Sequence, residues 1–144
     1  MFRPAIPMTV LCVALATAAP RLKDPPAQAS AEGRWTVERY EKEVVVRDAT
    51  AMAGYVMLHT KTESTLELNG RVIGTERVTY TEAGGVHQVD FTSDQWAGVK
   101  RGIWKVEGDT LTECESAVDG ERPTDFTAPR GSGRSVWVLR RVKE

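Results

Sequence analysis

Cysteine and histidine are scarce in this sequence. Its 144 residues include only two of each, Cys12 and Cys114, His59 and His87. Two widely separated cysteines do not form a disulfide framework, and the histidines lie too far apart for a local metal-binding motif. We therefore predict no metal site and no cofactor.

The sequence also has no large excess of one sign of charge and no long apolar run. The chain has 19 basic and 20 acidic residues, a formal net charge of −1. Such a balance provides no electrostatic basis for binding nucleic acid or an anionic membrane. The apolar run at residues 8–15 is far shorter than the ~20 residues that cross a bilayer. We predict no transmembrane segment once the leader described next is removed.

Residues 1–18 have the pattern of a bacterial secretory signal peptide. Arg3 precedes the apolar run, and Ala16-Thr17-Ala18 supplies a small-x-small cleavage site. We predict cleavage after Ala18 and export to the periplasm or outside the cell. Residues 19–31 hold three of the seven prolines and are typical of a flexible linker, which leaves residues 32–144 as one domain.

The rest of the chain shows the alternation of short β-strands, separated by turn residues. Every connection except residues 116–134 is too short for a crossover, so neighbouring strands should pair in an antiparallel way. We predict an eight-stranded antiparallel up-and-down barrel, in which residues 44–46 extend or bend the first strand and residues 47–54 form a helical turn. The expected strands are 33–42, 55–60, 65–69, 71–81, 86–92, 99–106, 110–115 and 135–142.

Two groups of residues resemble known proteins. Gly33-Arg34-Trp35, with Arg141 near the C-terminus, resembles the signature of lipocalin-like barrels, in which the arginine stacks over the tryptophan at the closed end. The segment from Gly102 onward is similar to a planctomycete-type family of secreted lipocalin-like domains of unknown function. The resemblance implies a barrel and export, and no activity. Its motifs are Gly-Ile-Trp at 102–104, Gly-Asp-Thr-Leu-Thr at 108–112, Cys114, Arg-Pro-Thr at 122–124, Phe126, Gly-Ser-Gly at 131–133 and Val-Leu-Arg-Arg at 138–141.

No catalytic constellation is recognisable. Cys114 lies between Glu113 and Glu115, whose charges disfavour a thiolate. Ser132 lies in a Gly-Ser-Gly segment that lacks the nucleophile-elbow pattern. We predict that the protein is not an enzyme.

The turn at Gly108-Asp109 places Trp104 opposite Glu113 on one face of a hairpin. If Trp104 points into the barrel, Glu113 and Glu115 do too, and Arg39 is then the best-placed basic partner. The alternative register puts both glutamates in solvent and Cys114 in the core.

Two further aromatic residues lie in connections. Trp96, in the connection at 93–98, either caps the barrel or contacts a ligand at its rim. Phe126 should anchor the connection at 116–134 against the barrel, because it is the only large apolar side chain there.

Two functions remain open. The first is an exported small binding protein that holds an apolar or amphipathic ligand in or at the mouth of the barrel, with Arg39, Trp96, Trp104, Glu113 and Glu115 as candidate contacts. The second is an interaction or inhibitor module that has a filled barrel and binds another envelope protein through its loops. An open lumen favours the first function.

Overall fold

The computed structural model describes residues 30–143. The predicted signal peptide and linker residues 19–29 lie outside these residues. Ala31, at the end of the expected linker, is only 3% exposed, and its carbonyl oxygen accepts a hydrogen bond of 3.0 Å from the Trp35 indole. The contacts of the domain thus begin before residue 32.

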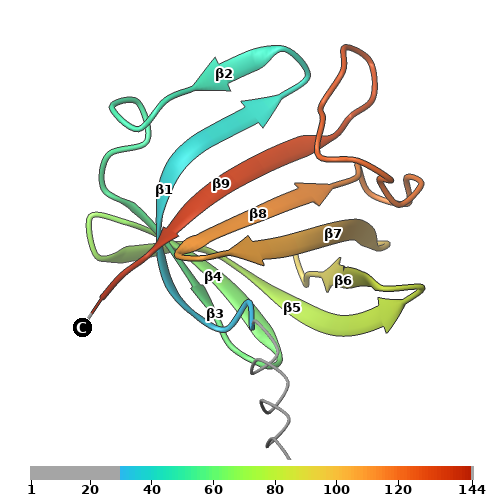
Figure 1. Cartoon of the computed structure of the whole chain (residues 1–144), viewed down its shortest axis with the longest axis horizontal. Helices are drawn as coiled ribbons and strands as arrows, with labels where there is room; N and C mark the ends of the chain where they lie inside the picture. Colours follow the sequence, from blue (N-terminus) through green and yellow to red (C-terminus); the bar gives the residue numbers. More distant parts are fainter. Residues whose placement is uncertain (1–29, 144) are drawn as a thin grey trace, which may run out of the picture.

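The described chain forms a closed antiparallel barrel, as predicted (Figure 1). Sequential strands pair with one another, and β1 pairs with β9 to close the ring. Among residues 30–143, no helix has the length and hydropathy needed to cross a bilayer. The strands are β1 (Gly33–Lys42), β2 (Val45–Arg47), β3 (Tyr55–His59), β4 (Glu63–Leu68), β5 (Arg71–Ala83), β6 (Val86–Thr92), β7 (Lys100–Glu107), β8 (Thr110–Glu115) and β9 (Ser135–Arg141).

Strand β2 is the ninth strand and lies outside the closed ring, paired only with β1. The expectation that residues 44–46 extend or bend the first strand is wrong, because the chain reverses at Glu43 and Val44, which both have positive φ. Between β2 and β3 the chain makes a single turn, in which the Met52 amide donates to the Asp48 carbonyl over 3.0 Å. The Asp48 carboxylate accepts from the Ala51 amide, also over 3.0 Å. The predicted turn is therefore present, with Asp48 as its cap.

A β-bulge in β1 changes which side chains face the lumen. The pairing of β1 with β9 shifts register between Val37 and Arg39. Trp35 and Val37 are buried before the shift, and Tyr40 packs against the core after it. Arg39 points outward instead, with its side chain 52% exposed and 3.0 Å from Glu41. The expectation that Arg39 faces Glu113 is wrong, because a bulge inserts one residue and reverses the alternation.

Two hydrophobic clusters pack on either side of the barrel wall. The lumen holds the first, which includes Trp35, Leu111 and Leu139 with no exposed surface. The second lies outside, where the 116–134 loop folds over the β7, β8 and β9 wall and its half-buried Phe126 packs beside buried Cys114. Phe126 thus anchors the loop, as predicted.

The outer cluster also settles the register of β8. Trp104 pairs with Glu113, and Gly102 pairs with Glu115, as the hairpin turn predicted. Both glutamates are buried on the lumen side, and the loop buries Cys114 on the other side. The alternative register, with the glutamates in solvent, is wrong.

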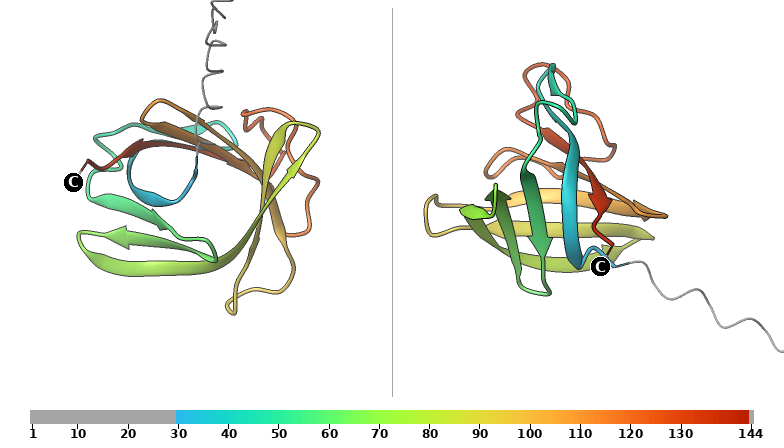
Figure 2. Two further views of the ribbon diagram at one scale, coloured as in Figure 1. Left: turned by 60° about the horizontal axis from the view of Figure 1, so that its bottom comes forward. Right: turned by 90° about the vertical axis from the view of Figure 1, so that its left-hand side faces the viewer.

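Because sequential strands alternate in direction, the connections divide between two ends of the barrel. The N-terminal end holds the first described residues, the end of β9 and the β3–β4, β5–β6 and β7–β8 turns (Figure 2). Arg141 and Val142 lie beside Ser30 and Arg34 there. The loop end holds the β4–β5 turn and the loops at 93–98 and 116–134.

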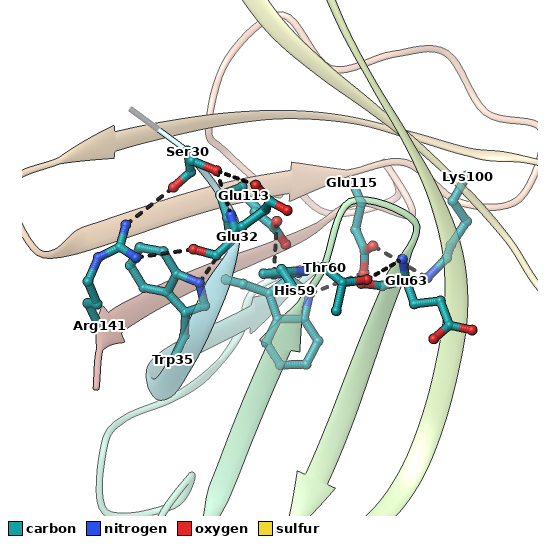
Figure 3. A network of polar contacts seen from close by, with 12 residues as sticks. Ser30, Glu32, Trp35, His59, Thr60, Glu63, Lys100, Glu113, Glu115 and Arg141 are labelled. Carbon is teal, nitrogen blue, oxygen red and sulfur yellow. Dashed lines mark hydrogen bonds and ion pairs between the residues drawn. The ribbon is translucent and has the colours of Figure 1, made fainter. Parts of the chain in front are cut away.

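The predicted contact between Trp35 and Arg141 is confirmed at the N-terminal end. The Arg141 guanidinium carbon lies 4.2 Å from the centre of the indole ring (Figure 3). Arg141 also donates to the backbone oxygens of Glu32 and Ser30, over 3.1 and 3.2 Å. Gly33 has a φ of 134°, and a Cβ atom there would lie 2.9 Å from the Arg141 guanidinium. Glycine is thus required for the arginine to reach its tryptophan.

Candidate ligand-binding site

The barrel has a large cavity at its N-terminal end. Its volume is about 630 Å³, and we call it the mouth cavity. Trp35 and Arg141 lie on β1 and β9, and neither strand lines the cavity. The lining residues are Ser30, Ala31, Glu32, Lys61, Thr62, Val78, Thr79, Tyr80, Thr81, Glu82, His87 and Trp104.

Aromatic side chains form one wall of the mouth cavity. His87 and Trp104 are cross-strand partners on β6 and β7, and their rings stack 4.2 Å apart at 15°. The Tyr80 ring meets the Trp104 ring edge-on, with 6.0 Å between the centres. Glu82 holds the His87 ring through a 2.6 Å contact between Oε1 and Nδ1. These contacts give a preorganised aromatic surface.

Two buried polar atoms on this wall lack a protein partner. They are the Tyr80 hydroxyl and the Trp104 indole nitrogen. A buried donor without an acceptor costs about 1–3 kcal/mol. Both atoms are closed off from solvent, so they lie behind the surface of the open mouth cavity.

A smaller cavity of about 130 Å³ lies deeper in the lumen, and we call it the inner cavity. Glu115 on its wall accepts a 3.1 Å hydrogen bond from the Trp137 indole and lies 3.4 Å from the Lys100 ammonium. Lys100 also lies 2.7 Å from Glu76. The lining residues are Met57, Ser64, Leu66, Gly74, Glu76, Phe91, Lys100, Glu113, Glu115 and Trp137.

Glu113 and His59 form a buried pair between β8 and β3. Each is only 2% exposed, and the carboxylate Oε1 lies 3.3 Å from the imidazole Nε2 (Figure 3). Burial, followed by the charges of Glu115 and Glu76, raises the pKa of Glu113 to about 8. Burial lowers the pKa of His59 to about 4. At neutral pH the pair therefore carries a protonated carboxyl and a neutral imidazole.

The sequence-predicted site residues divide between four places. Trp104 lines the mouth cavity, while Glu113 and Glu115 line the inner cavity. Trp96 lies at the loop end, packed against the lumen cluster, with the Lys100 ammonium 5.3 Å from its ring centre. It therefore caps that end and does not line the mouth cavity. Arg39 lies outside the barrel.

Sequence reasoning missed Tyr80, His87, His59 and Lys100. For Lys100 a signal was present, since it lies two and four residues before Gly102 and Trp104 and so shares their face of β7. His87 pairs with Trp104 across the neighbouring strands β6 and β7, a register that the 93–98 loop does not fix from sequence. Tyr80 reaches Trp104 from β5, and His59 reaches Glu113 from a strand that does not pair with β8.

Comparison of the chain with protein-family models, curated proteins and solved structures found no match.

Proposed function

We propose that the protein is a small binding protein that holds an apolar or amphipathic ligand in its mouth cavity. The observation that carries this proposal is the aromatic wall, in which Trp104 stacks on His87 and meets Tyr80 edge-on. The cavity volume of about 630 Å³ falls within the roughly 300–1,000 Å³ of small-molecule sites. The aromatic rings would bind the apolar body of the ligand.

The proposal is of binding rather than catalysis. Two carboxyl–imidazole pairs are relevant here. Glu82 and His87 line the mouth cavity and contact each other over 2.6 Å. Glu113 and His59, whose side chains are 3% and 0% exposed, contact each other away from this cavity. Among residues 30–143, no cluster of three potential ligands for a metal ion is present. We also propose that the protein acts outside the cytoplasm, which the leader pattern of residues 1–18 supports. The resemblance to secreted lipocalin-like domains supports the same location.

Binding of the neutral fluorescent probe 1-N-phenylnaphthylamine to the purified mature protein tests the proposal. We expect saturable enhancement of its emission, because an apolar cavity shields the probe from water. His87→Ala at the cavity rim and Trp104→Ala in its wall should each weaken binding on the order of tenfold, or about 1.4 kcal/mol. Trp96→Ala, at the loop end, is the matched control and should leave the affinity unchanged.

Two outcomes would refute this function. One is the absence of saturable probe binding to the folded wild-type protein. The other is binding that neither His87→Ala nor Trp104→Ala weakens. Because His87 is half-buried at the rim, its substitution remains informative even if Trp104→Ala does not fold.

A second function, recognition of another protein, is favoured by the valines after β1. Val44, Val45 and Val46 are 50–59% exposed, and the outer edge of β2 is unpaired. Such an edge can accept a strand from a partner. Two results together would favour this function. The wild-type protein would bind no fluorescent probe, and it would bind a purified envelope protein saturably. Val45→Lys would abolish that second binding.

A further inference from the structure

We propose that the lumen below the mouth cavity binds the ammonium head of an amphipathic primary amine, with Glu113 as its counter-ion. This inference rests on the proposed function, because the apolar body of the amine would occupy the mouth cavity. It assigns the ligand a chemical class and gives a role to a buried carboxyl that the mouth cavity does not use.

The charges in the lumen favour a cation. Three carboxyls, those of Glu76, Glu113 and Glu115, face this space, and Lys100 is the one ammonium among the residues that line the inner cavity. Lys100 contacts Glu76 and Glu115. Glu113 Oε1 makes no hydrogen bond of good geometry, although the neutral His59 ring lies nearby. The titratable groups that face Glu113 are His59 on β3, Glu76 and Tyr80 on β5, Lys100 on β7 and Glu115 on β8.

One residue in the wall of each cavity is paired with one in the wall of the other. Trp104 lines the mouth cavity, Glu113 lines the inner cavity, and they are direct cross-strand partners on β7 and β8. The Cβ atoms of such partners lie roughly 4.5–5.5 Å apart. A chain that lies against Trp104 therefore brings its end group to Glu113. The inner cavity, about 130 Å³, has room for an ammonium group, since a water molecule occupies about 30 Å³ in the liquid.

Binding of the amine should release a proton. At neutral pH Glu113 holds a proton, and a free alkylamine is already an ammonium ion. Formation of the ion pair converts the carboxyl to a carboxylate, and its proton passes to the solvent. His59 does not retain it, because burial disfavours the imidazolium. The ammonium leaves water only if a carboxylate compensates the cost of several kcal/mol.

Decylamine and decan-1-ol, compared by displacement of 1-N-phenylnaphthylamine and by calorimetry, test this inference. The two ligands share one alkyl chain and differ in the charge of the head group. We expect the wild-type protein to bind the amine on the order of tenfold more tightly, or about 1.4 kcal/mol. Glu113→Gln should abolish this preference. Glu121→Gln, which removes the same charge from an exposed position in the 116–134 loop, is the matched control and should retain it.

Calorimetry at pH 7 in two buffers of different ionisation enthalpy counts the released protons. We expect close to one proton per amine and none for the alcohol. Equal affinities for amine and alcohol, a preference that survives Glu113→Gln, or amine binding without proton release would each overturn the inference. The comparison of amine with alcohol and the proton count both use the wild-type protein, so the inference stays testable if Glu113→Gln does not fold. Failure of the fluorescent probe itself to bind would instead refute the proposed function.

Discussion

Raising the pH from 6.5 to 8.5 should destabilise the folded protein, and Glu113 is the reason. Its pKa rises from 4.5 to about 8 on folding. Between these values the folded state holds a proton that the unfolded state has released. The free energy of unfolding therefore falls as the pH rises through this range.

His59 acts in the opposite sense at lower pH. Its pKa falls from 6.5 to about 4 on folding, so the unfolded state holds the extra proton between these values and stability rises with pH. Between pH 4.5 and 6.5 the contributions of Glu113 and His59 largely cancel. Transfer of the proton from the carboxyl to the imidazole would not alter this result, because it leaves the number of bound protons unchanged.

Above pH 6.5 the contribution of Glu113 remains. One proton difference corresponds to about 1.36 kcal/mol per pH unit. Integration to pH 8.5, with the residual gain from His59 subtracted, gives a loss of about 1.5 kcal/mol. The raised pKa values of Lys100 and Cys114 act above this range, since their ordinary values are 10.5 and 9.0. Burial also raises the pKa of Glu76, so any contribution from this carboxyl has the same sign as that of Glu113.

Urea denaturation of the mature protein at pH 6.5, 7.5 and 8.5 measures this loss. The Glu113→Gln variant has no proton to release at this position, so its unfolding free energy should change much less over the same range. Glu121→Gln, at an exposed position, should behave like the wild-type protein. A wild-type stability that rises with pH, or a Glu113→Gln variant that keeps the full loss, would refute the assignment of a buried, protonated Glu113.

Three further predictions rest on the fold and one on the signal sequence. Arg141→Ala should lower the unfolding free energy by about 1–2 kcal/mol, because it removes a guanidinium stacked on a buried indole. Arg140→Ala, on the outer face, should have a much smaller effect, and equal effects in thermal denaturation would contradict the stacking. Phe126→Ala should cost about 1.5–2.5 kcal/mol and expose the 116–134 loop to proteolysis; an unchanged melting temperature and cleavage rate would show that it is no anchor. Native Cys114 should react with a thiol reagent far more slowly than in urea, because it is buried and burial raises its pKa to about 11; equal rates would place it in solvent. Mass spectrometry of the exported protein should give a chain cleaved after Ala18, and recovery of the uncleaved chain from the envelope would contradict the predicted signal peptide.

Local sequence patterns predicted the eight strands of the closed ring and their order, but not the separate strand β2. Alternating side chains mark the strands, and short turns restrict each strand to pairing with its neighbours in sequence. The turn at Gly108-Asp109 correctly predicted the pairing of Trp104 with Glu113. Closure of the barrel followed from the same topology, and it brings Trp35 and Arg141 together.

Side-chain environments depended on tertiary structure wherever two distant segments meet. The bulge after Val37 directs the Arg39 side chain out of the barrel, and no residue type in that strand predicts the bulge. The 116–134 loop folds over the outer wall, so Cys114 is buried although it lies on the face opposite the lumen. Lys100 contacts Glu115 because the two side chains, on the paired strands β7 and β8, both point into the lumen.

The sequence by itself thus determined an antiparallel barrel and the side of the hairpin on which Trp104, Glu113 and Glu115 lie, because both depend on contacts between neighbouring segments. Only the tertiary structure decided that the mouth cavity lies beside Tyr80 and His87, and that Glu113 faces His59. The contact between Glu113 and His59 joins strands that are not neighbours in the closed ring. Their geometry depends on strand tilt and on the volumes of all the side chains in the lumen, which no local pattern encodes.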